Sequence, residues 1–515
     1  MGWPLEIQWP LRKAYVLIES WKSDDIFATI THSIMFKEKK KFYITTTLPY
    51  VNADPHLGFA LEIIQADVVA RYYRSEGYDV FFNTGTDEHG LKVFRKAKES
   101  NIDPKAYCDS LVEKFKKLKD ALNISYDNFI RTTDENHINA AQQFWILCQK
   151  NGDIYKKKYK IKYCVGCELE KTDSELVDGR CPIHPNQEIE IIEEENYFFK
   201  YSHYQKKLLA FYKKNNTFVV PESRFNEIKE FTKRGLEDFS ISRLKEKVPW
   251  GVLVPGDESH IMYVWFDALV SYIAALGWPE NQKQYTDFWP GLQVAGKDNL
   301  RQQSSMWQAM LLSAGLKNSR QIFIHGFITA DGQKMSKSLG NVIDPFELVK
   351  KYGTDAVRYY LLREITPTED GDFSYEKFEQ RYNADLAGGV GNLLARTITL
   401  ALKPNVKEKK PSAKIKKAAA KASKDSKKYL AEFKFNEALK SIWDLISFCD
   451  KYINEQKPWE GKSSASQVVC DVLFALSAVA DMLQPFLPET AERIIHAVNS
   501  KKSMILFPRI QTPKG

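Results

Sequence analysis

The 515-residue sequence lacks the features that mark membrane-bound, secreted or repetitive proteins. No apolar run approaches the length of a membrane span, so we expect no contact with a membrane. The N-terminal stretch 1–40 has no continuous apolar segment because residues 21–25 interrupt it, which excludes a signal peptide. Internal repeats are absent. Seven cysteines without a secretory segment indicate a reducing compartment, and we expect a cytoplasmic location.

The bulk composition is that of a soluble globular chain, with 43% hydrophobic and 27% charged residues. The net charge of +8 fits a polyanionic partner, but it fits simple solubility equally well, and both readings stay open. Two readings also stay open for residues 1–34. They are an upstream extension before a true start at Met35, or a tail of the protein itself.

The chain reads as an α/β half followed by a helical half. A strand pattern at 42–47, a helical pattern at 57–76 and a second strand at 79–84 predict a parallel sheet. A turn-rich, cysteine-bearing stretch at 159–190 interrupts this order, and a second α/β portion follows at 263–328. We therefore predict an α/β fold with a Rossmann-like, doubly wound sheet split by an insertion.

After Ser338 the apolar spacing becomes helical, at 344–363, 384–402, 429–457 and 466–499, which predicts a helical bundle. The segment 403–428 holds eleven lysines and is expected to be an exposed loop or a solvated helix face, with direct RNA contact as the alternative. The expected division is an extension at 1–40, α/β halves at 41–153 and 241–339, the insertion at 154–240, a stem at 340–385 and the helical domain at 386–515.

Cys164 and Cys167 form a C-x2-C pair, and Cys181 and His184 form a C-x2-H pair thirteen residues later. Each short spacing presents two ligands to a tetrahedral zinc ion, so the four residues predict one closed, structural zinc site. The alternative is a set of free cysteines beside a surface histidine. The remaining cysteines lie in helical patterns and are expected to be ordinary core residues: Cys108, Cys148, Cys449 and Cys470.

Two short motifs far apart in the sequence predict one nucleotide site. Asp54 and Pro55 suit the N-cap and first position of a helix, which places His56 in the first turn, where free N–H groups attract phosphate. His56 and Phe59, three residues apart, are expected to share a helix face. In the second motif, Lys334 and Lys337 supply point charges for a leaving pyrophosphate.

Further candidates lie at the predicted carboxyl ends of strands, where α/β sheets bind ligands. Asp87 follows the strand 79–84 and could hold an ammonium group or cap a helix. Trp265, Ala268 and Tyr272 fall near one face if this stretch is helical, although such spacing is more typical of core packing. Asp298, in the stretch 296–298 after a short strand, is a weaker candidate.

Taken in order, these motifs resemble the methionyl-tRNA synthetase family of class I aminoacyl-tRNA synthetases, in the bacterial-type branch with a single zinc knuckle. Residues 334–338 match the KMSKS motif at all five positions, and residues 56–59 match HxGH at three of four, because Phe59 replaces the second histidine. The segments 49–52, 84–90 and 263–268 add to the likeness, which runs from about Lys41 to the C-terminus.

The resemblance implies ATP-dependent ligation of L-methionine to its tRNA through a methionyl-adenylate, for initiation and elongation of translation. It implies one structural Zn²⁺ per chain, Mg²⁺ with ATP, and initiator and elongator methionine tRNAs as partners. No appended tRNA-binding module is apparent after Pro508, so we expect a monomer without a dimerisation domain.

The resemblance also assigns roles to individual residues. It implies catalytic roles for His56, Lys334, Lys337 and Arg243, and ATP contacts for His56, Gly58, Glu62, Asp298, Lys334 and Lys337. It implies methionine contacts for Leu48, Tyr50, Asp87, Trp265, Ala268 and Tyr272, and anticodon contacts for Asn392, Arg396 and Trp459.

Three positions depart from the family pattern near the reaction centre: Phe59, and Asn299 and Gln303, where many members have an aliphatic residue and a histidine. Two alternatives therefore stay open. One is a non-catalytic RNA-binding relative that lost activation through Phe59, although the intact KMSKS motif, Asp87 and Arg243 speak against it. The other is a class I synthetase for another apolar amino acid, although no large editing insertion is present.

Overall fold

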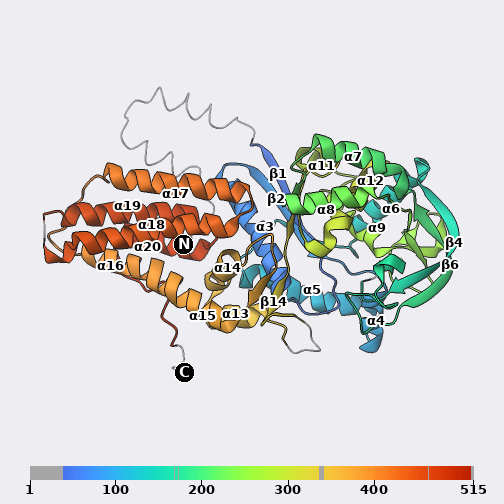
Figure 1. Cartoon of the computed structure of the whole chain (residues 1–515), viewed down its shortest axis with the longest axis horizontal. Coiled ribbons are helices and arrows are strands. Elements are labelled where there is room, and N and C mark those ends of the chain that lie inside the picture. The colour runs from blue at the N-terminus through green and yellow to red at the C-terminus, as the bar shows by residue number, and fades with distance from the viewer. Residues whose placement is uncertain (1–38, 168, 172, 336–340, 462, 512–515) are drawn as a thin grey trace, which may run out of the picture.

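The computed structural model describes residues 39–511 apart from 168, 172, 336–340 and 462. The expectations for residues 1–34 and for Ser336, Lys337 and Ser338 lie outside this part of the chain. The described chain is elongated, with a sheet-containing lobe at one end and a helical bundle at the other (Figure 1).

The sheet-containing lobe is built on a six-stranded parallel sheet in the order β3-β2-β1-β12-β13-β7. Its strands are β1 (Lys41–Thr46), β2 (Asp79–Thr86), β3 (Asn128–Arg131), β7 (Val219–Val220), β12 (Leu292–Gly296) and β13 (Gln321–His325). The strand order runs outward in both directions from β1, which pairs with β2 on one side and with β12 on the other. The doubly wound sheet is therefore confirmed, and β1 lies at its switch point, where α/β sheets place ligands.

Helix α3 (Leu57–Ser75) connects β1 to β2 and starts at the carboxyl edge of the sheet. Its residues from Leu57 to Ala70 are buried almost all round, because the helix packs between the sheet and the stem helix α14 (Thr354–Arg363). Its burial on all sides explains why an amphipathic stripe is weak here.

The insertion is a second, antiparallel sheet formed mainly by β4 (Ile154–Cys164) and β6 (Glu190–Phe199), with β5 (Leu169–Lys171) and β8 (Phe239–Ser240) at its edges. The knuckle residues lie between β4 and β6. Strand β7 falls within the range 154–240 that we expected for the insertion, yet it pairs with β13 of the parallel sheet.

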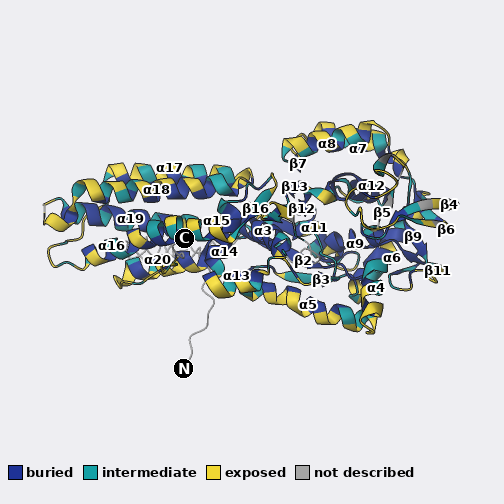
Figure 2. Cartoon of the chain, turned by 60° about the horizontal axis from the view of Figure 1, so that its bottom comes forward, coloured by how far each residue is buried: buried dark blue, intermediate teal, exposed yellow. Residues whose placement is uncertain are grey.

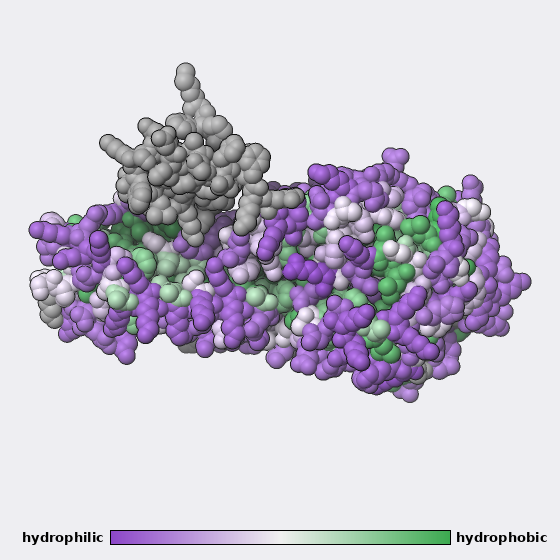
Figure 3. All heavy atoms as spheres, turned by 90° about the horizontal axis from the view of Figure 1, so that it is seen from above, coloured by the Kyte–Doolittle hydropathy of each residue, from purple (hydrophilic) through white to green (hydrophobic). Residues whose placement is uncertain are grey.

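The C-terminal lobe is a bundle of α16 (Asn392–Ala401), α17 (Ala413–Ala431), α18 (Phe435–Gln456), α19 (Ala465–Leu483) and α20 (Pro488–Ser500). The lysine-rich segment 403–428 forms a loop and most of α17, whose inner side carries Ile415, Ala419 and Ala422 (Figure 2). Its lysines therefore occupy a solvated helix face. Hydrophilic side chains predominate on the side of the molecule seen in Figure 3.

Helix α19 corrects one expectation, because its 19 residues are long and apolar enough to cross a membrane. Of its most apolar window, 56% is buried, and the helix packs against α17, α18 and α20. Its apolarity thus serves the core of the bundle.

A buried arginine joins the two lobes. Arg358 on α14 is fully buried and forms an ion pair of 2.8 Å with Asp67 of α3. Its guanidinium also donates to the carbonyls of Leu122, Pro485 and Phe486, the last two lying between α19 and α20. Every polar edge of the buried cation thus has a partner, as burial of a charge requires.

Candidate active site and metal centre

The start of α3 differs from the expectation. His56 is the N-cap and has an extended backbone, while Asp54 pairs with Lys114 at 2.7 Å, so Asp54 and Pro55 do not begin the helix. The Leu57 N–H donates to the Ile343 carbonyl, and the Gly58 N–H donates to Nδ1 of His56 at 3.0 Å. Two amides that we expected to be free thus already have acceptors. Because Nδ1 accepts, the ring carries its proton on Nε2, which is a donor.

This arrangement of His56 determines the surroundings of the next residues, Gly58 and Phe59. A Cβ at Gly58 would lie 2.9 Å from Cε1 of His56, so only glycine fits beside the ring. Phe59 is buried in the core and packs edge-to-face on Phe115. Since His56 precedes the helix, the expected i, i+3 face shared by His56 and Phe59 does not form.

Glu62, one turn further along α3, lies between the ends of two strands. Its Oε1 accepts from the backbone and hydroxyl of Thr47, and its Oε2 contacts Nε2 of His325 at 2.9 Å. Burial acts to lower the pKa of His325, but Glu62 outweighs it and raises that pKa. Asp298 adjoins this pair, since a Cβ on Gly296 would meet both Asp298 and His325, and burial raises the pKa of Asp298.

Asp87 lies just beyond the carboxyl end of β2 and is 2% exposed. It forms an isolated bridge with Tyr50, its N–H donates to the Pro49 carbonyl, and the Val51 N–H donates to its carbonyl. Tyr50 in turn packs edge-to-face on Trp265 at 6.4 Å. The structure therefore brings the 48–51 segment, Asp87 and Trp265 together.

A buried carboxylate that was not predicted from the motifs connects the segments around Asp87 and Trp265. Asp267, in α9 (Val264–Ala268), contacts Nδ1 of His89 at 2.6 Å and Nε2 of His137 at 2.5 Å. Burial opposes its ionisation, but the two imidazoles bring the pKa of Asp267 down to about 2. Asp267 thus ties the segment with Trp265 and Ala268 to the segment with Asp87.

Tyr272, in α10 (Ser271–Ala274), is 3% exposed. The side-chain amide of Gln303 donates to its hydroxyl at 2.5 Å. Gln303 belongs to a short π-helical segment, η4 (Gln302–Met306), a form often found at functional sites. The departure at Gln303 is thus part of the hydrogen bonding around Tyr272.

Arg243 lies on β9 (Ser242–Leu244), beside the insertion, and is 5% exposed. Its guanidinium stacks over the rings of Tyr263 at 4.6 Å and Tyr163 at 5.3 Å, and it donates to Ser240 and to the Ser242 carbonyl. Because Tyr263 precedes α9 and Tyr163 precedes Cys164, Arg243 links the amino-acid side of the site to the knuckle.

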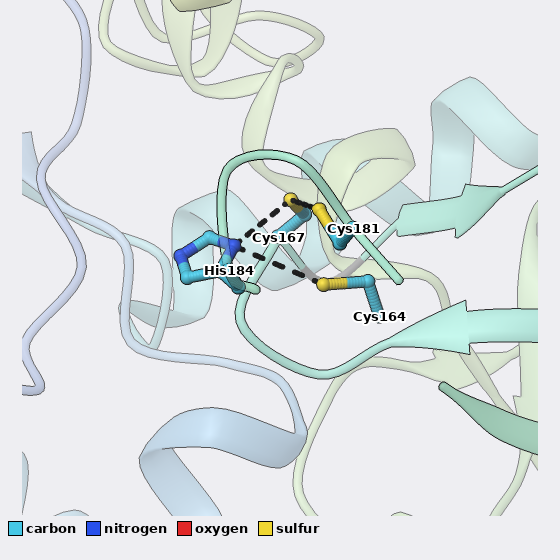
Figure 4. Close-up of side chains that lie close together, drawn as sticks. All are labelled: Cys164, Cys167, Cys181 and His184. Atoms are coloured by element: carbon cyan, nitrogen blue, oxygen red, sulfur yellow. Dashed lines mark hydrogen bonds between the residues drawn. The ribbon is translucent and has the colours of Figure 1, made fainter. Parts of the chain in front are cut away.

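The four predicted ligands form one cluster between β4 and β6 (Figure 4). His184 Nδ1 lies 3.2 Å from the sulfur of Cys167 and 3.8 Å from that of Cys164, and the sulfurs of Cys167 and Cys181 are 3.5 Å apart. Tetrahedral zinc separates such ligand atoms by about 3.5–3.8 Å, so the set fits the ion. Of the other cysteines, Cys108, Cys148 and Cys449 are buried as expected, whereas Cys470 is only half-buried.

The remaining predicted residues belong to other elements. Lys334 ends β15 (Gln333–Lys334), which pairs with β14 (Ile328–Ala330), whereas Lys337 lies outside the described residues. In the bundle, Asn392 and Arg396 are four residues apart on α16, and the Arg396 guanidinium lies 4.7 Å over the ring of Trp459. Asn392 is exposed, and Trp459 is 41% exposed.

Family models match most of the chain. The model of "tRNA synthetases class I (M)" matches residues 42–191 and 176–398, and that of the "Anticodon-binding domain of tRNA ligase" matches residues 413–514. Together with the split parallel sheet and the helical bundle, these matches define a class I aminoacyl-tRNA synthetase.

Individual relatives narrow the class. The chain is 44% identical to the methionine–tRNA ligase of Thermotoga maritima, and the match covers 89% of this chain and 75% of that protein. It is also 44% identical to the methionine–tRNA ligase of Thermosynechococcus vestitus, and this match covers 88% of this chain and 89% of that protein. It superimposes on Mycobacterium tuberculosis methionyl-tRNA synthetase in complex with methionyl-adenylate with a TM-score of 0.84 and 36% identity, covering 92% of this chain and 99% of that one. The chain belongs to the methionine–tRNA ligase family, which removes the alternative of a synthetase for another apolar amino acid.

Proposed function

We propose that the carboxyl edge of the parallel sheet is where this methionine–tRNA ligase joins methionine to ATP and then to its tRNA. A methionine carboxylate oxygen attacks the α-phosphorus of ATP, the bond to the β-phosphate breaks, and pyrophosphate leaves. A terminal hydroxyl of the tRNA then attacks the acyl carbon, and AMP leaves. The observation that carries the proposal is that His56 lies in the segment between β1 and α3 and that Glu62 and Asp87 both contact this segment, at the switch point of the sheet.

On the amino-acid side, Asp87 binds the ammonium group, and Leu48, Tyr50, Trp265, Ala268 and Tyr272 surround the side chain. The burial of Asp87 and the edge-to-face contact of Tyr50 with Trp265 support this assignment. A buried carboxylate binds an ammonium group strongly because water does not screen the pair.

On the nucleotide side, Nε2–H of His56 donates to phosphate, and Gly58 leaves space beside it for adenine. Glu62 and Asp298 accept from the ribose hydroxyls. Lys334 and Lys337 stabilise the charge that grows on the phosphates, with Mg²⁺ entering as part of the ATP complex. The protein thus positions the reactants and supplies charge, without covalent catalysis. Arg243 acts from the amino-acid side, supported by its stacking on Tyr263.

Recognition of initiator and elongator methionine tRNAs is assigned to Asn392, Arg396 and Trp459. Asn392 and Arg396 can read base edges, and an exposed tryptophan can stack on a splayed base. The convergence of Arg396 and Trp459 from two different helical segments supports one shared surface.

Zn²⁺ is assigned to Cys164, Cys167, Cys181 and His184, where it would cross-link the insertion between β4 and β6 and take no part in the reaction. A Cβ on Gly166 would lie 2.5 Å from the His184 ring, so the knuckle closes only around glycine. The absence of disulfides among the described cysteines supports a location in the cytoplasm.

Methionine-dependent ATP–pyrophosphate exchange tests the activity. The unsubstituted chain should exchange, whereas His56→Ala and Asp87→Ala should each lose at least about a hundredfold, in line with loss of one charge-stabilising contact. Asp103→Ala, at an exposed helix N-cap, is the matched control and should leave the rate unchanged. An inactive unsubstituted chain would reinstate the non-catalytic alternative.

Elemental analysis tests the knuckle. Protein purified without chelator should hold about one zinc per chain, and Cys181→Ser should lose it. Exchange activity measured at low temperature should survive in Cys181→Ser better than in Asp87→Ala. A chain without zinc that takes none up on addition contradicts the assignment.

A further inference from the structure

A small three-stranded sheet carries Lys334 and joins it to the stem. Its order is β15-β14-β16, and β16 (Gly371–Phe373) follows α14 in the chain. Strands β14 and β15 form an antiparallel hairpin, and β14 pairs in parallel with β16. Thr329 on β14 lies opposite Lys334 on one side and opposite Asp372 on the other. A residue of the stem thus shares one row of the sheet with the lysine that we assign to the phosphates.

The hairpin that leads to Lys334 is short and turns sharply. Its loop is the pair Asp331 and Gly332, with φ of +51° and +74°. Positive φ at both loop residues is typical of the type I′ turn, which favours the sequence Asp-Gly. Strand β15 has only two residues, and an isolated two-stranded hairpin is marginally stable. The place of Lys334 therefore depends on the contacts that hold the turn.

The side chain of Asp372 holds this turn from the stem. Its Oδ1 accepts from the Gly332 N–H and from the Thr329 hydroxyl, each at 2.7 Å. The Asp331 N–H donates to the Phe373 carbonyl at 3.0 Å, so the stem contacts both loop residues. Burial acts to raise the pKa of Asp372, but the bonds from Gly332 and Thr329 outweigh it and lower that pKa. The acceptor is therefore an ionised carboxylate, which strengthens both bonds.

The stem strand is itself fixed against the parallel sheet. The Gly371 N–H donates to the Phe327 carbonyl at 2.8 Å, and the Phe327 N–H donates to the Asp370 carboxylate at 2.9 Å. Asp370 also forms an ion pair of 2.5 Å with Lys297, the neighbour of Asp298. Because these contacts bind β16 to the end of the large sheet, Asp372 reaches the hairpin from a strand whose position is set.

Resting on the proposed function, we infer that Asp372 is a positioning residue, which acts through the turn at Asp331 and Gly332 to place Lys334 for the departing pyrophosphate. A cation lowers the barrier only when it is held in place before charge develops, so loss of the Asp372 contact should slow activation. Methionine binding is assigned to Asp87 and should not change. Transfer to tRNA takes place after pyrophosphate has left, so this second step should not need Asp372.

Methionine-dependent ATP–pyrophosphate exchange tests the inference through its kcat and KM. In Asp372→Ala, kcat should fall about tenfold while the KM for methionine stays within twofold. Asp372→Asn keeps an acceptor at the place of Oδ1 and should retain at least half of kcat. Lys377→Ala is the matched control, because it removes only the ion pair of 3.6 Å with Oδ2 of Asp372, and it should change neither constant. An Asp372→Asn rate as low as that of Asp372→Ala contradicts a role through Oδ1.

Transfer of methionine to its tRNA from enzyme loaded with methionyl-adenylate separates positioning from general damage to the fold. Asp372→Ala should transfer at a rate within twofold of the unsubstituted chain, whereas a damaged fold would slow both steps. Added to Lys334→Met, Asp372→Ala should cause no further loss of kcat, because both changes remove the same stabilisation. An unchanged kcat in Asp372→Ala, equal losses in the two steps, or additive losses in the double variant overturns the inference.

Thr329→Val gives a second way to weaken the same contact. It removes one donor to Oδ1 of Asp372, keeps the shape of the side chain, and should lower kcat about threefold without a change in KM. Should Asp372→Ala not fold, Thr329→Val decides alone, and an unchanged kcat then overturns the inference. An unsubstituted chain without exchange would instead reject the proposed function.

Discussion

The two ends of the molecule present the residues that we propose for recognition in opposite ways. At the catalytic end, Asp87, Asp267 and Tyr272 are nearly inaccessible and held by hydrogen bonds within the protein. In the bundle, Asn392 and Trp459 are exposed and rest on a core to which they contribute little. A small amino acid has to be enclosed by a site built in advance, whereas a large RNA is met at a surface. Substitutions of these buried residues at the catalytic end should therefore change both stability and activity, and substitutions of the exposed residues Asn392 and Trp459 should change activity alone.

The largest effect is expected at Asp267. Asp267→Ala leaves two buried imidazoles without their carboxylate, so the free energy of unfolding should fall by about 3–5 kcal/mol. Methionine-dependent exchange should be lost even at temperatures where circular dichroism shows a folded chain. The control is Asp471→Ala, an equally buried carboxylate of the bundle that holds Ser412 and Tyr452. Asp471→Ala should lower the free energy of unfolding and leave the pyrophosphate-exchange rate unchanged. Equal exchange rates in the two variants would contradict the difference proposed between the two ends of the molecule.

The junction between the two ends should respond to pH. Asp355 on α14 accepts from the Thr490 N–H of α20, and its other oxygen has no hydrogen-bond partner among the described residues. Burial raises the pKa of Asp355 to about 6, with Glu489 adding to this and Arg358 opposing it. Between pH 4 and 6 the folded state then binds more protons than the unfolded state, so stability should fall as pH rises through this window.

Ionisation of Asp355 above pH 6 should cost about 3 kcal/mol, which Asp355→Asn removes. Urea unfolding of the two proteins from pH 4.5 to 7.5 measures this as a difference that grows with pH and then levels off. Asp103→Asn, at an exposed N-cap, should show a constant difference. A constant difference for Asp355→Asn as well would contradict the raised pKa.

A smaller and more selective effect is expected at the anticodon surface. Trp459→Ala removes a stacking face worth about 1–3 kcal/mol, so aminoacylation of methionine tRNA should fall about tenfold or more. Pyrophosphate exchange and the unfolding midpoint should stay unchanged. Tyr375→Ala, which removes an aromatic at the start of α15 (Tyr375–Arg381) that is 46% exposed, should change neither assay. Parallel falls in both assays would show that Trp459 serves the fold.

The smallest effect is expected at Phe59. Because Phe59 packs on Phe115, Phe59→His puts an imidazole into the core and restores no contact with phosphate by itself. The exchange rate should therefore change by no more than about tenfold, equivalent to about 1.4 kcal/mol. An inactive unsubstituted chain that Phe59→His rescues would show that His56 does not suffice on the nucleotide side.

The features that could be predicted from the sequence are those that depend on residues close together in the chain. The zinc ligands fall within one short stretch, and β1, α3 and β2 are local apolar segments, so their positions were predicted closely. The start of α3 was misplaced by two residues, because Asp54 prefers Lys114 to the helix amides and His56 caps instead. Helix α19 can be identified as a core helix of the bundle only when the helices packed around it are known.

The contacts that could not be predicted from the sequence join residues that are far apart in the chain. His137 and Asp267 are 130 residues apart, and Glu62 and His325 are 263 apart, so no local pattern joins them. His325 does end an apolar strand, a signal that could have marked it, since strand ends line the sites of α/β sheets. For Asp267, next to Ala268 in the same motif, the only hint was a charge among apolar neighbours.

The buried arginine between the lobes has a consequence for the size of the nucleic acid that fits. A guanidinium bonded at once to Asp67 and to the carbonyls of Leu122, Pro485 and Phe486 cannot shift without breaking several bonds together. Helix α3, which begins directly after His56, and the bundle that carries Trp459 are thereby held at one separation. With this separation fixed, we expect an RNA that is too short, or bent the wrong way, to reach one of the two proposed sites and to miss the other.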